Sequence, residues 1–249
     1  MKILINAQKL TIMIFALCLT TSNLQAMFSS FFRGLTPPWY SAQEIPTPNP
    51  EKTCDKLMHA VWCNETDKAL AAIAALDRRG KTTEILTYSC DTWFWRSMQR
   101  ILVVATEQKN TRLMQELLRT DRPVELRQRM LCATGRLSDT ALMQAINNND
   151  PVAVGIIIQA ATVCGCLNRV LTTVGFDEQK SLLLAVNLRC NLEIIATIAQ
   201  ATINSQLFPD ILEAWNMANE KRYPEIAAFL IGFIEQNFVV TGVVVGPVV

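Results

Sequence analysis

Histidine, glycine and charged side chains are all scarce in this chain. Its 249 residues include 1 histidine and 9 glycines, only 18% are charged, and the formal net charge is +1. The lysines and arginines form no basic run, so the sequence predicts neither nucleic-acid binding nor attraction to an anionic membrane. Since 50% of the residues are hydrophobic, wholesale disorder is excluded and the chain is long enough to bury a core.

The motifs that carry common enzyme chemistry are also missing. There is no Gly-rich phosphate loop, paired-histidine metal motif or nucleophile elbow. A catalytic triad or Cys–His pair would have to use His59, which stands beside Ala60 in a helical pattern that already explains it. With Cys54 and Cys63, His59 offers three zinc ligands without a CxxC pair, whereas a structural zinc site needs four. We therefore expect no enzyme, no cofactor and no metal.

The first 26 residues have the pattern of a secretory leader. Lys2 and Lys9 precede an apolar run at residues 10–19, no acidic residue occurs before Glu44, and position 26 is alanine. The run is shorter than the roughly 20 residues of a membrane-spanning helix, so no span is expected after cleavage. We interpret residues 1–26 as a signal peptide of a secreted or periplasmic protein; a host-directed factor and a periplasmic housekeeping protein both fit it.

The cysteines beyond the leader are odd in number. They are Cys54, Cys63, Cys90, Cys132, Cys164, Cys166 and Cys190. In an oxidising compartment an odd count implies at least one free or intermolecular thiol. Most of them are explained as small buried hydrophobes. Cys164-Gly-Cys166 lacks the spacing of a thioredoxin-like motif, which leaves open a disulfide to another cysteine or an enzyme site built from Cys164, Cys166 or His59.

A proline-rich linker at residues 27–50 separates the leader from a region in which one helical pattern recurs five times. Each copy has a large apolar residue followed three positions later by alanine. The pairs are Leu57/Ala60, Leu102/Ala105, Leu142/Ala145, Leu182/Ala185 and Trp215/Ala218. A polar turn and a second apolar helix follow, and we expect that helix to end 13 residues after the alanine. Those positions are Ile73, Leu118, Ile158, Ile198 and Ile231.

The spacing has a direct physical meaning. Residues at i and i+3 share one face of a helix, so the small alanine admits a neighbouring helix while the large residue fills the space beside it. A single helix–turn–helix unit cannot bury this apolar face alone, and the copies must therefore stack. The sequence predicts an all-α fold, an α-solenoid of about five units at residues 51–237.

This pattern resembles the ankyrin repeat, whose core reads T-P-L-H-x-A-A followed by a polar turn and E-V-V-x-L-L-L. Residues 140–158 and 213–231 match it best. The alanines are spaced by 45, 40, 40 and 33 residues, and the turn glycine of the family is absent from all copies. Additional short helices are expected at residues 121–135 and 164–175. A ~40-residue unit also suits armadillo or HEAT repeats, and a compact bundle is a third alternative.

In ankyrin-like units the first helix contributes to the face that binds a protein partner. The resemblance places the residue two positions after each alanine on that face. These residues are Trp62, Glu107, Asn147, Asn187 and Glu220. Their variety suits a recognition surface, because a core position would be uniformly apolar. The apolar tail at residues 238–249 has three possible roles: it caps the last unit, it docks to a partner as a strand, or it mediates self-assembly.

Overall fold

Helices make up the regular structure of the residues that the computed structural model describes, which are 50–87, 100–135, 139–175 and 178–238. Within these ranges there is no strand, and the only bridge of β type joins Thr134 to Thr140. The predicted all-α class is confirmed. The expected signal peptide at residues 1–26, the linker up to residue 49 and tail residues 239–249 lie outside the described residues.

Each of the five sequence copies corresponds to two helices joined by a short turn. The pairs are α3 (Pro50–Trp62) with α4 (Thr66–Arg78), α6 (Ile101–Glu107) with α7 (Thr111–Leu117), α9 (Ala141–Asn147) with α10 (Pro151–Val163), α12 (Ser181–Asn187) with α13 (Leu192–Asn204), and α14 (Phe208–Glu220) with α15 (Pro224–Phe238). Polar side chains at the turns start several second helices. Asn110 accepts a hydrogen bond from the amide of Leu113, and Asp150 accepts one from the amide of Ala153.

The turns inside the pairs share one backbone geometry. The fourth residue after each alanine has a left-handed φ of 50–57°. The amide of the fifth residue after the alanine donates to the carbonyl of that alanine at 2.8–3.0 Å. The amide of the fourth residue donates to the carbonyl of the residue that directly follows the alanine, at 2.9–3.0 Å. These two bonds form a Schellman motif, which satisfies carbonyls at the end of the first helix. The same closure in all five copies explains why each first helix stops where it does.

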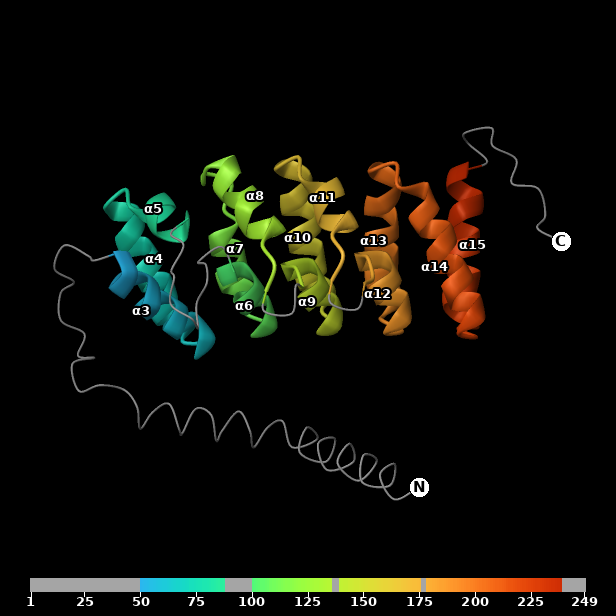
Figure 1. Cartoon of the computed structure of the whole chain (residues 1–249), viewed down its shortest axis with the longest axis horizontal. Coiled ribbons are helices and arrows are strands. Elements are labelled where there is room, and N and C mark those ends of the chain that lie inside the picture. Colours follow the sequence, from blue (N-terminus) through green and yellow to red (C-terminus); the bar gives the residue numbers. More distant parts are fainter. Residues whose placement is uncertain (1–49, 88–99, 136–138, 176–177, 239–249) are drawn as a thin grey trace, which may run out of the picture. The chain divides into compact units, whose positions relative to one another are not determined.

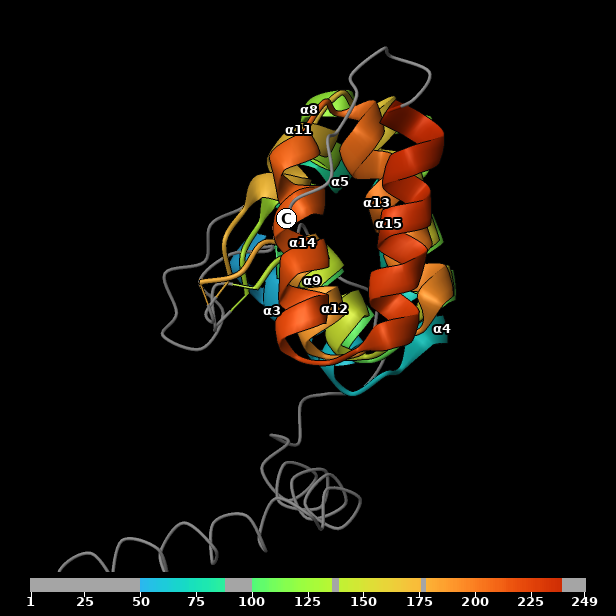
Figure 2. The same cartoon turned by 90° about the vertical axis from the view of Figure 1, so that its right-hand side faces the viewer.

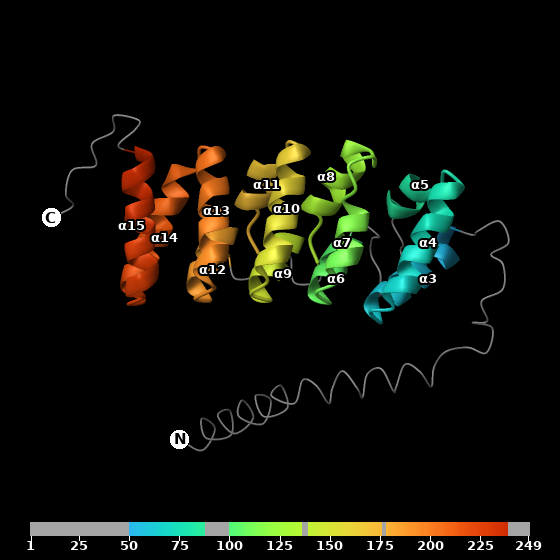
Figure 3. The same cartoon turned by 180° about the vertical axis from the view of Figure 1, so that it is seen from behind.

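Successive pairs contact each other in chain order. Helices α3, α6, α9, α12 and α14 contact one another in turn, and so do α4, α7, α10 and α13. Figure 1 shows the pairs of the described region as a row, and Figure 3 shows this row from behind. Viewed along the row, α3, α9, α12 and α14 fall in one layer and α4, α13 and α15 in another (Figure 2).

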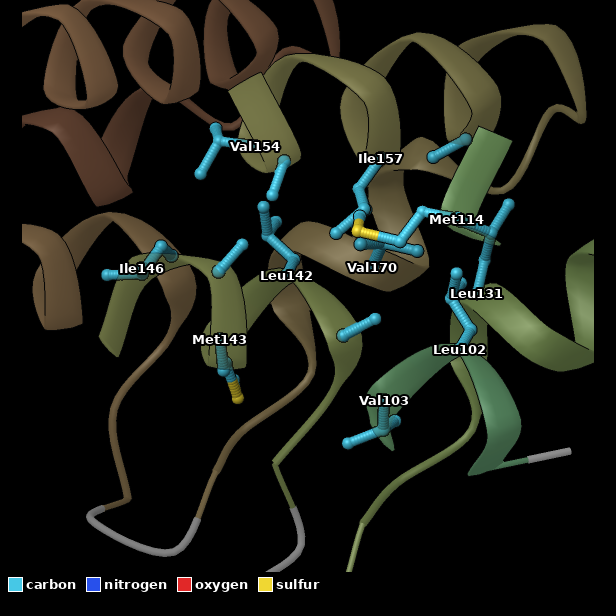
Figure 4. Packing of buried hydrophobic residues seen from close by; sticks show 14 of the residues in the cluster. Leu102, Val103, Met114, Leu131, Leu142, Met143, Ile146, Val154, Ile157 and Val170 are labelled. Atoms are coloured by element: carbon cyan, nitrogen blue, oxygen red, sulfur yellow. The ribbon is translucent and has the colours of Figure 1, made fainter. Parts of the chain in front are cut away.

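The core lies between these layers and between neighbouring pairs. The five alanines of the sequence pattern are all buried, as are Leu57, Leu102, Leu142 and Leu182. Met114 of α7, Ile157 of α10 and Val170 of a following short helix are fully buried in the same cluster (Figure 4). Alanine leaves room for the adjoining helix while leucine fills the space beside it, as the i, i+3 spacing predicts.

Short third helices follow three of the pairs. The predicted additional helices are present as α8 (Val124–Cys132) and α11 (Leu167–Thr172). A further helix, α5 (Thr82–Thr87), was not predicted. Helix α8 contacts both α5 and α11, so the short helices also pack in order.

The ends predicted for the second helices are wrong in most copies. Helix α4 continues to Arg78 and α10 to Val163, five residues beyond the expected ends. Helices α13 and α15 also extend past their expected ends, to Asn204 and Phe238. The residues that follow the expected ends favour helix, and the chain turns only at the left-handed Gly80 and Gly165. Among the helices of the described residues, the longest is α15, with 15 residues. In the described part of the chain no helix has the length and apolar character needed to cross a membrane.

Candidate binding surface

The five residues expected to bind a partner occupy equivalent places in the structure. Each is the last residue of the first helix of its pair, immediately before the left-handed turn. These residues are Trp62, Glu107, Asn147, Asn187 and Glu220. All are exposed except the half-buried Asn187. Because successive first helices are in contact, the row of helices brings these side chains to one edge of the described region.

The chemistry of this edge varies from pair to pair. Trp62 is a large apolar side chain with 42% of its surface exposed. The surrounding protein removes part of the hydration of Glu107, which raises the pKa of its carboxyl. Asn187 donates a hydrogen bond to the Gln179 side chain at 3.1 Å, which orients its amide. An exposed indole beside carboxylates and amides offers both apolar contact and hydrogen bonding to a protein.

The left-handed turn residues extend the same edge, and the sequence analysis missed them. They are Asn64, Lys109, Asn149, Arg189 and Arg222, all exposed. Their common position could be read from the sequence, since each lies four residues after a pattern alanine, but their left-handed conformation could not. We define the binding edge as these five turn residues together with the five helix-terminal residues.

Hydrogen bonds between neighbouring pairs hold the binding edge in place. Asn110 donates to the Asn64 side chain at 2.9 Å, and the Asn191 amide donates to the Asn149 side chain at 3.0 Å. Asn148 donates to the carbonyl of Thr106 at 2.8 Å. These contacts fix the turns in the free protein, so the surface that they form is preorganised.

The native Lys109 is expected to destabilise its turn, because a non-glycine residue is unfavourable at a left-handed φ. Lys109→Gly should therefore raise the free energy of unfolding by about 0.5–1 kcal/mol in urea denaturation, after allowing for the flexibility that glycine adds to the unfolded chain. The matched control is Asn149→Gly, since asparagine tolerates this φ and its side chain also accepts the bond from Asn191. A gain for Asn149→Gly and a loss for Lys109→Gly would contradict this account.

A cavity of about 230 Å³ lies beside the short helices, away from the binding edge. Its lining includes Asp77, Arg119 and Arg122. The guanidinium of Arg122 is engaged by both carboxylate oxygens of Asp77, at 3.1 and 3.2 Å, and by the Glu116 side chain at 3.0 Å. The charges that line this cavity therefore neutralise one another, and their arrangement favours a structural role over capture of an anion.

The candidate nucleophiles of the sequence fall in two separate places. The Cys63 sulfur lies within sulfur hydrogen-bonding distance of His59, 3.8 and 3.7 Å from its two ring nitrogens, as expected for side chains one helical turn apart. Cys164 and Cys166 are buried at the turn between α10 and α11. Among the described residues, no three or more histidine, cysteine, aspartate or glutamate side chains are grouped to hold a metal ion. The side chain of Cys54 is not among those described.

Known proteins provide no relative from which a site could be transferred. Neither a family model, nor a curated protein, nor a solved structure matches the chain. The function proposed below therefore depends on the geometry and chemistry of the binding edge.

Proposed function

We propose that this chain is an exported protein-interaction scaffold, an α-solenoid of ankyrin-like units that binds a protein partner along the binding edge. The observation that carries the proposal is the coincidence of varied side chains with an invariant backbone. Five turns have the same hydrogen bonds and φ, yet the residue before the turn is tryptophan, glutamate or asparagine. A purely structural position would keep one side-chain type, whereas recognition requires different ones.

Several features support a solenoid over a compact bundle. First helices contact first helices in chain order, and second helices do the same from α4 to α13. Such nearest-neighbour packing is characteristic of repeat proteins, which present extended surfaces to their partners. The short helices α5, α8 and α11 give three of the units a third helix, a feature shared with armadillo repeats, so the ankyrin relationship is itself a proposal.

Export is the second part of the proposal. Its support is the leader-like pattern of residues 1–26, and the expected compartment is the periplasm or the exterior of the cell. We infer a protein partner because the edge combines an exposed indole with amides and both signs of charge, without the basic stripe that a nucleic acid requires.

Alanine substitution on the binding edge tests the scaffold role. Full-length protein carrying a photo-crosslinking residue at position 147 first identifies the partner by mass spectrometry. Trp62→Ala is then expected to raise the Kd for that partner by about tenfold to thirtyfold, because a large aromatic side chain buried at an interface contributes roughly 1.4–2 kcal/mol. Glu107→Ala and Glu220→Ala should have smaller effects, and the thermal midpoint of unfolding should stay within about 2 °C of the parent.

The control is Gln159→Ala, which truncates an exposed residue of α10, in the other helix layer. It should leave both Kd and Tm unchanged. If Trp62→Ala lowers Tm and leaves Kd unaltered, the residue packs the first pair and the proposed edge is wrong.

Self-assembly through residues 238–249 is the alternative function. It predicts that removal of residues 239–249 reduces the oligomer size measured by light scattering. A cysteine-dependent enzyme is a further alternative, and it predicts an activity that thiol alkylation abolishes.

A further inference from the structure

Three cysteines gather where the short helix α8 meets the turn between α10 and α11. Cys132 is the last residue of α8, Cys164 follows α10, and Cys166 precedes α11. Gln128 of α8 donates a hydrogen bond to the carbonyl of Cys164 at 2.6 Å, and it thereby fixes α8 against the turn. Helix α8 also contacts both α10 and α11. These thiols are therefore held together by three elements from two successive units.

Within this cluster, Cys132 and Cys166 are direct partners. The Cys132 and Cys166 side chains are close enough to shift each other's pKa as hydrogen-bonding partners, whereas Cys164 and Cys132 affect each other through charge alone. Cys132 is half-buried, while Cys164 and Cys166 are both buried. The pair therefore consists of one thiol that a reagent from solution can reach and one that it reaches poorly.

The electrostatic surroundings make the two thiols unequal. The hydrogen bond from Cys166, opposed by burial and helped by the charge of Arg169, lowers the pKa of Cys132 to about 7. The same bond, together with burial, raises the pKa of Cys166. Burial also raises the pKa of Cys164, against the charge of Arg127. Cys132 is thus the thiol that is present as thiolate near neutral pH, and the thiolate is the attacking species.

We propose that Cys132 and Cys166 form a reversible disulfide that links two successive units, with an external disulfide, a small molecule or a protein, as the oxidant. The Cys132 thiolate attacks one sulfur of the external disulfide and forms a mixed disulfide, releasing the first thiolate. Cys166 loses its proton to solvent and attacks the Cys132 sulfur, releasing the second thiolate. The two cysteines give up two electrons and two protons, and the external disulfide becomes two thiols.

The link would change the stability of the array and not its surface. It joins α8, which follows the second helix pair, to α11, which follows the third, so it restricts the unfolded chain between residues 132 and 166. Of the residues that form the binding edge, only Asn147 and Asn149 lie in the segment that the disulfide would close. The inference does not depend on the scaffold role, because it rests on the positions of the thiols and on their surroundings.

Peptide mapping of the full-length protein identifies the pair. The protein carries Cys63→Ser to remove an exposed thiol, and it is treated with oxidised glutathione, alkylated and digested with trypsin. Cys132 lies in the tryptic peptide 130–136, and Cys164 and Cys166 share the peptide 137–169. We expect these peptides to be linked in the parent and in Cys164→Ser, and unlinked in Cys132→Ser and Cys166→Ser. A link that survives Cys166→Ser but not Cys164→Ser overturns the proposal, as does full alkylation of the treated parent.

Thermal unfolding and alkylation kinetics give two independent readouts. Oxidation should raise Tm by about 5–10 °C in the parent and in Cys164→Ser, with no change in Cys166→Ser. Linked peptides without a gain in Tm would refute the stabilising role. In reduced protein, alkylation of Cys132 should be half-maximal near pH 7, and Cys166→Ala should move this midpoint upward because the hydrogen-bond donor is lost. An unmoved midpoint contradicts the direct partnership.

Discussion

Replacement of Arg122 by alanine is expected to lower the free energy of unfolding by about 2–3 kcal/mol, measured by urea denaturation. Arg122 is 6% exposed and connects the second helix pair to the first. Its guanidinium donates to both oxygens of Asp77 in α4, to the Glu116 side chain and to the Glu116 carbonyl. Alanine leaves these acceptors without their donor. The partners keep some contact with water, so the expected loss is below that of a fully buried ion pair.

An exposed ion pair between the same two helix pairs is the control. Arg112 of α7 contacts Asp67 of α4 at 3.0 Å, and their side chains are 71% and 90% exposed. Water solvates both charges well, so Arg112→Ala should leave stability unchanged within error. Equal losses in the two variants would show that burial does not decide the contribution of such pairs in this fold.

The pH dependence of Arg122→Ala follows from Asp77. Burial alone would raise the pKa of Asp77, but hydrogen bonds from Thr82 and Arg122 and the charges of Arg122 and Arg119 together lower it below its ordinary value of 3.8. A depressed folded-state pKa stabilises the fold above pH 3.8, and this stabilisation disappears as the pH falls through the folded value. The difference in free energy of unfolding between the parent and Arg122→Ala should therefore become smaller as the pH falls below about 4.

Leu142→Ala should have an effect of similar or larger size, about 3–4 kcal/mol in denaturant unfolding. Leu142 is fully buried on α9, a helix that contacts α6, α10 and α12 (Figure 4). Truncation removes apolar contacts and leaves a cavity that helices on three sides cannot collapse into without moving. The effect should appear at the denaturation midpoint with an unchanged slope, since the same surface is exposed on unfolding.

Val152→Ala is the matched control for Leu142→Ala. Val152 lies on the neighbouring helix α10 but is 58% exposed, so its truncation opens no cavity. Stability should be unaltered or slightly raised, because alanine has the higher helix propensity. A loss below 1 kcal/mol for Leu142→Ala would mean that the large residue of the sequence pattern does not fill the space between pairs.

The sequence predicted the features that depend on local periodicity. The burial of the alanines and of Leu57, Leu102, Leu142 and Leu182 follows from spacing along one helix, and the structure confirms it. In the fifth copy Trp215 is only half-buried, while Ile211 and Ala214, one turn earlier, are fully buried. Helix α14 is longer than α6, α9 and α12, which gives it a second turn of residues to bury.

The features that sequence could not provide depend on contacts between units. Arg122 and Asp77 are 45 residues apart, and Cys132 and Cys166 are 34 apart. No short motif marks either pair, and each becomes visible only when neighbouring units are packed together. The residues at left-handed φ were missed for another reason. Lysine and arginine occupy three of the five turns, where glycine or asparagine would have signalled the conformation.

In each turn the main chain closes the turn and the side chains face solvent, which affects how the sequence of such a chain can diverge. Main-chain hydrogen bonds to the pattern alanine close the turn, so the exposed side chains beside it take no part in its closure. Substitutions of the exposed helix-terminal residues can accumulate with little loss of stability, whereas substitution of the alanine or its leucine partner removes core packing. If these positions bind a partner as proposed, its specificity can change while the framework stays fixed, and the positions beside the turns form a natural set for library design.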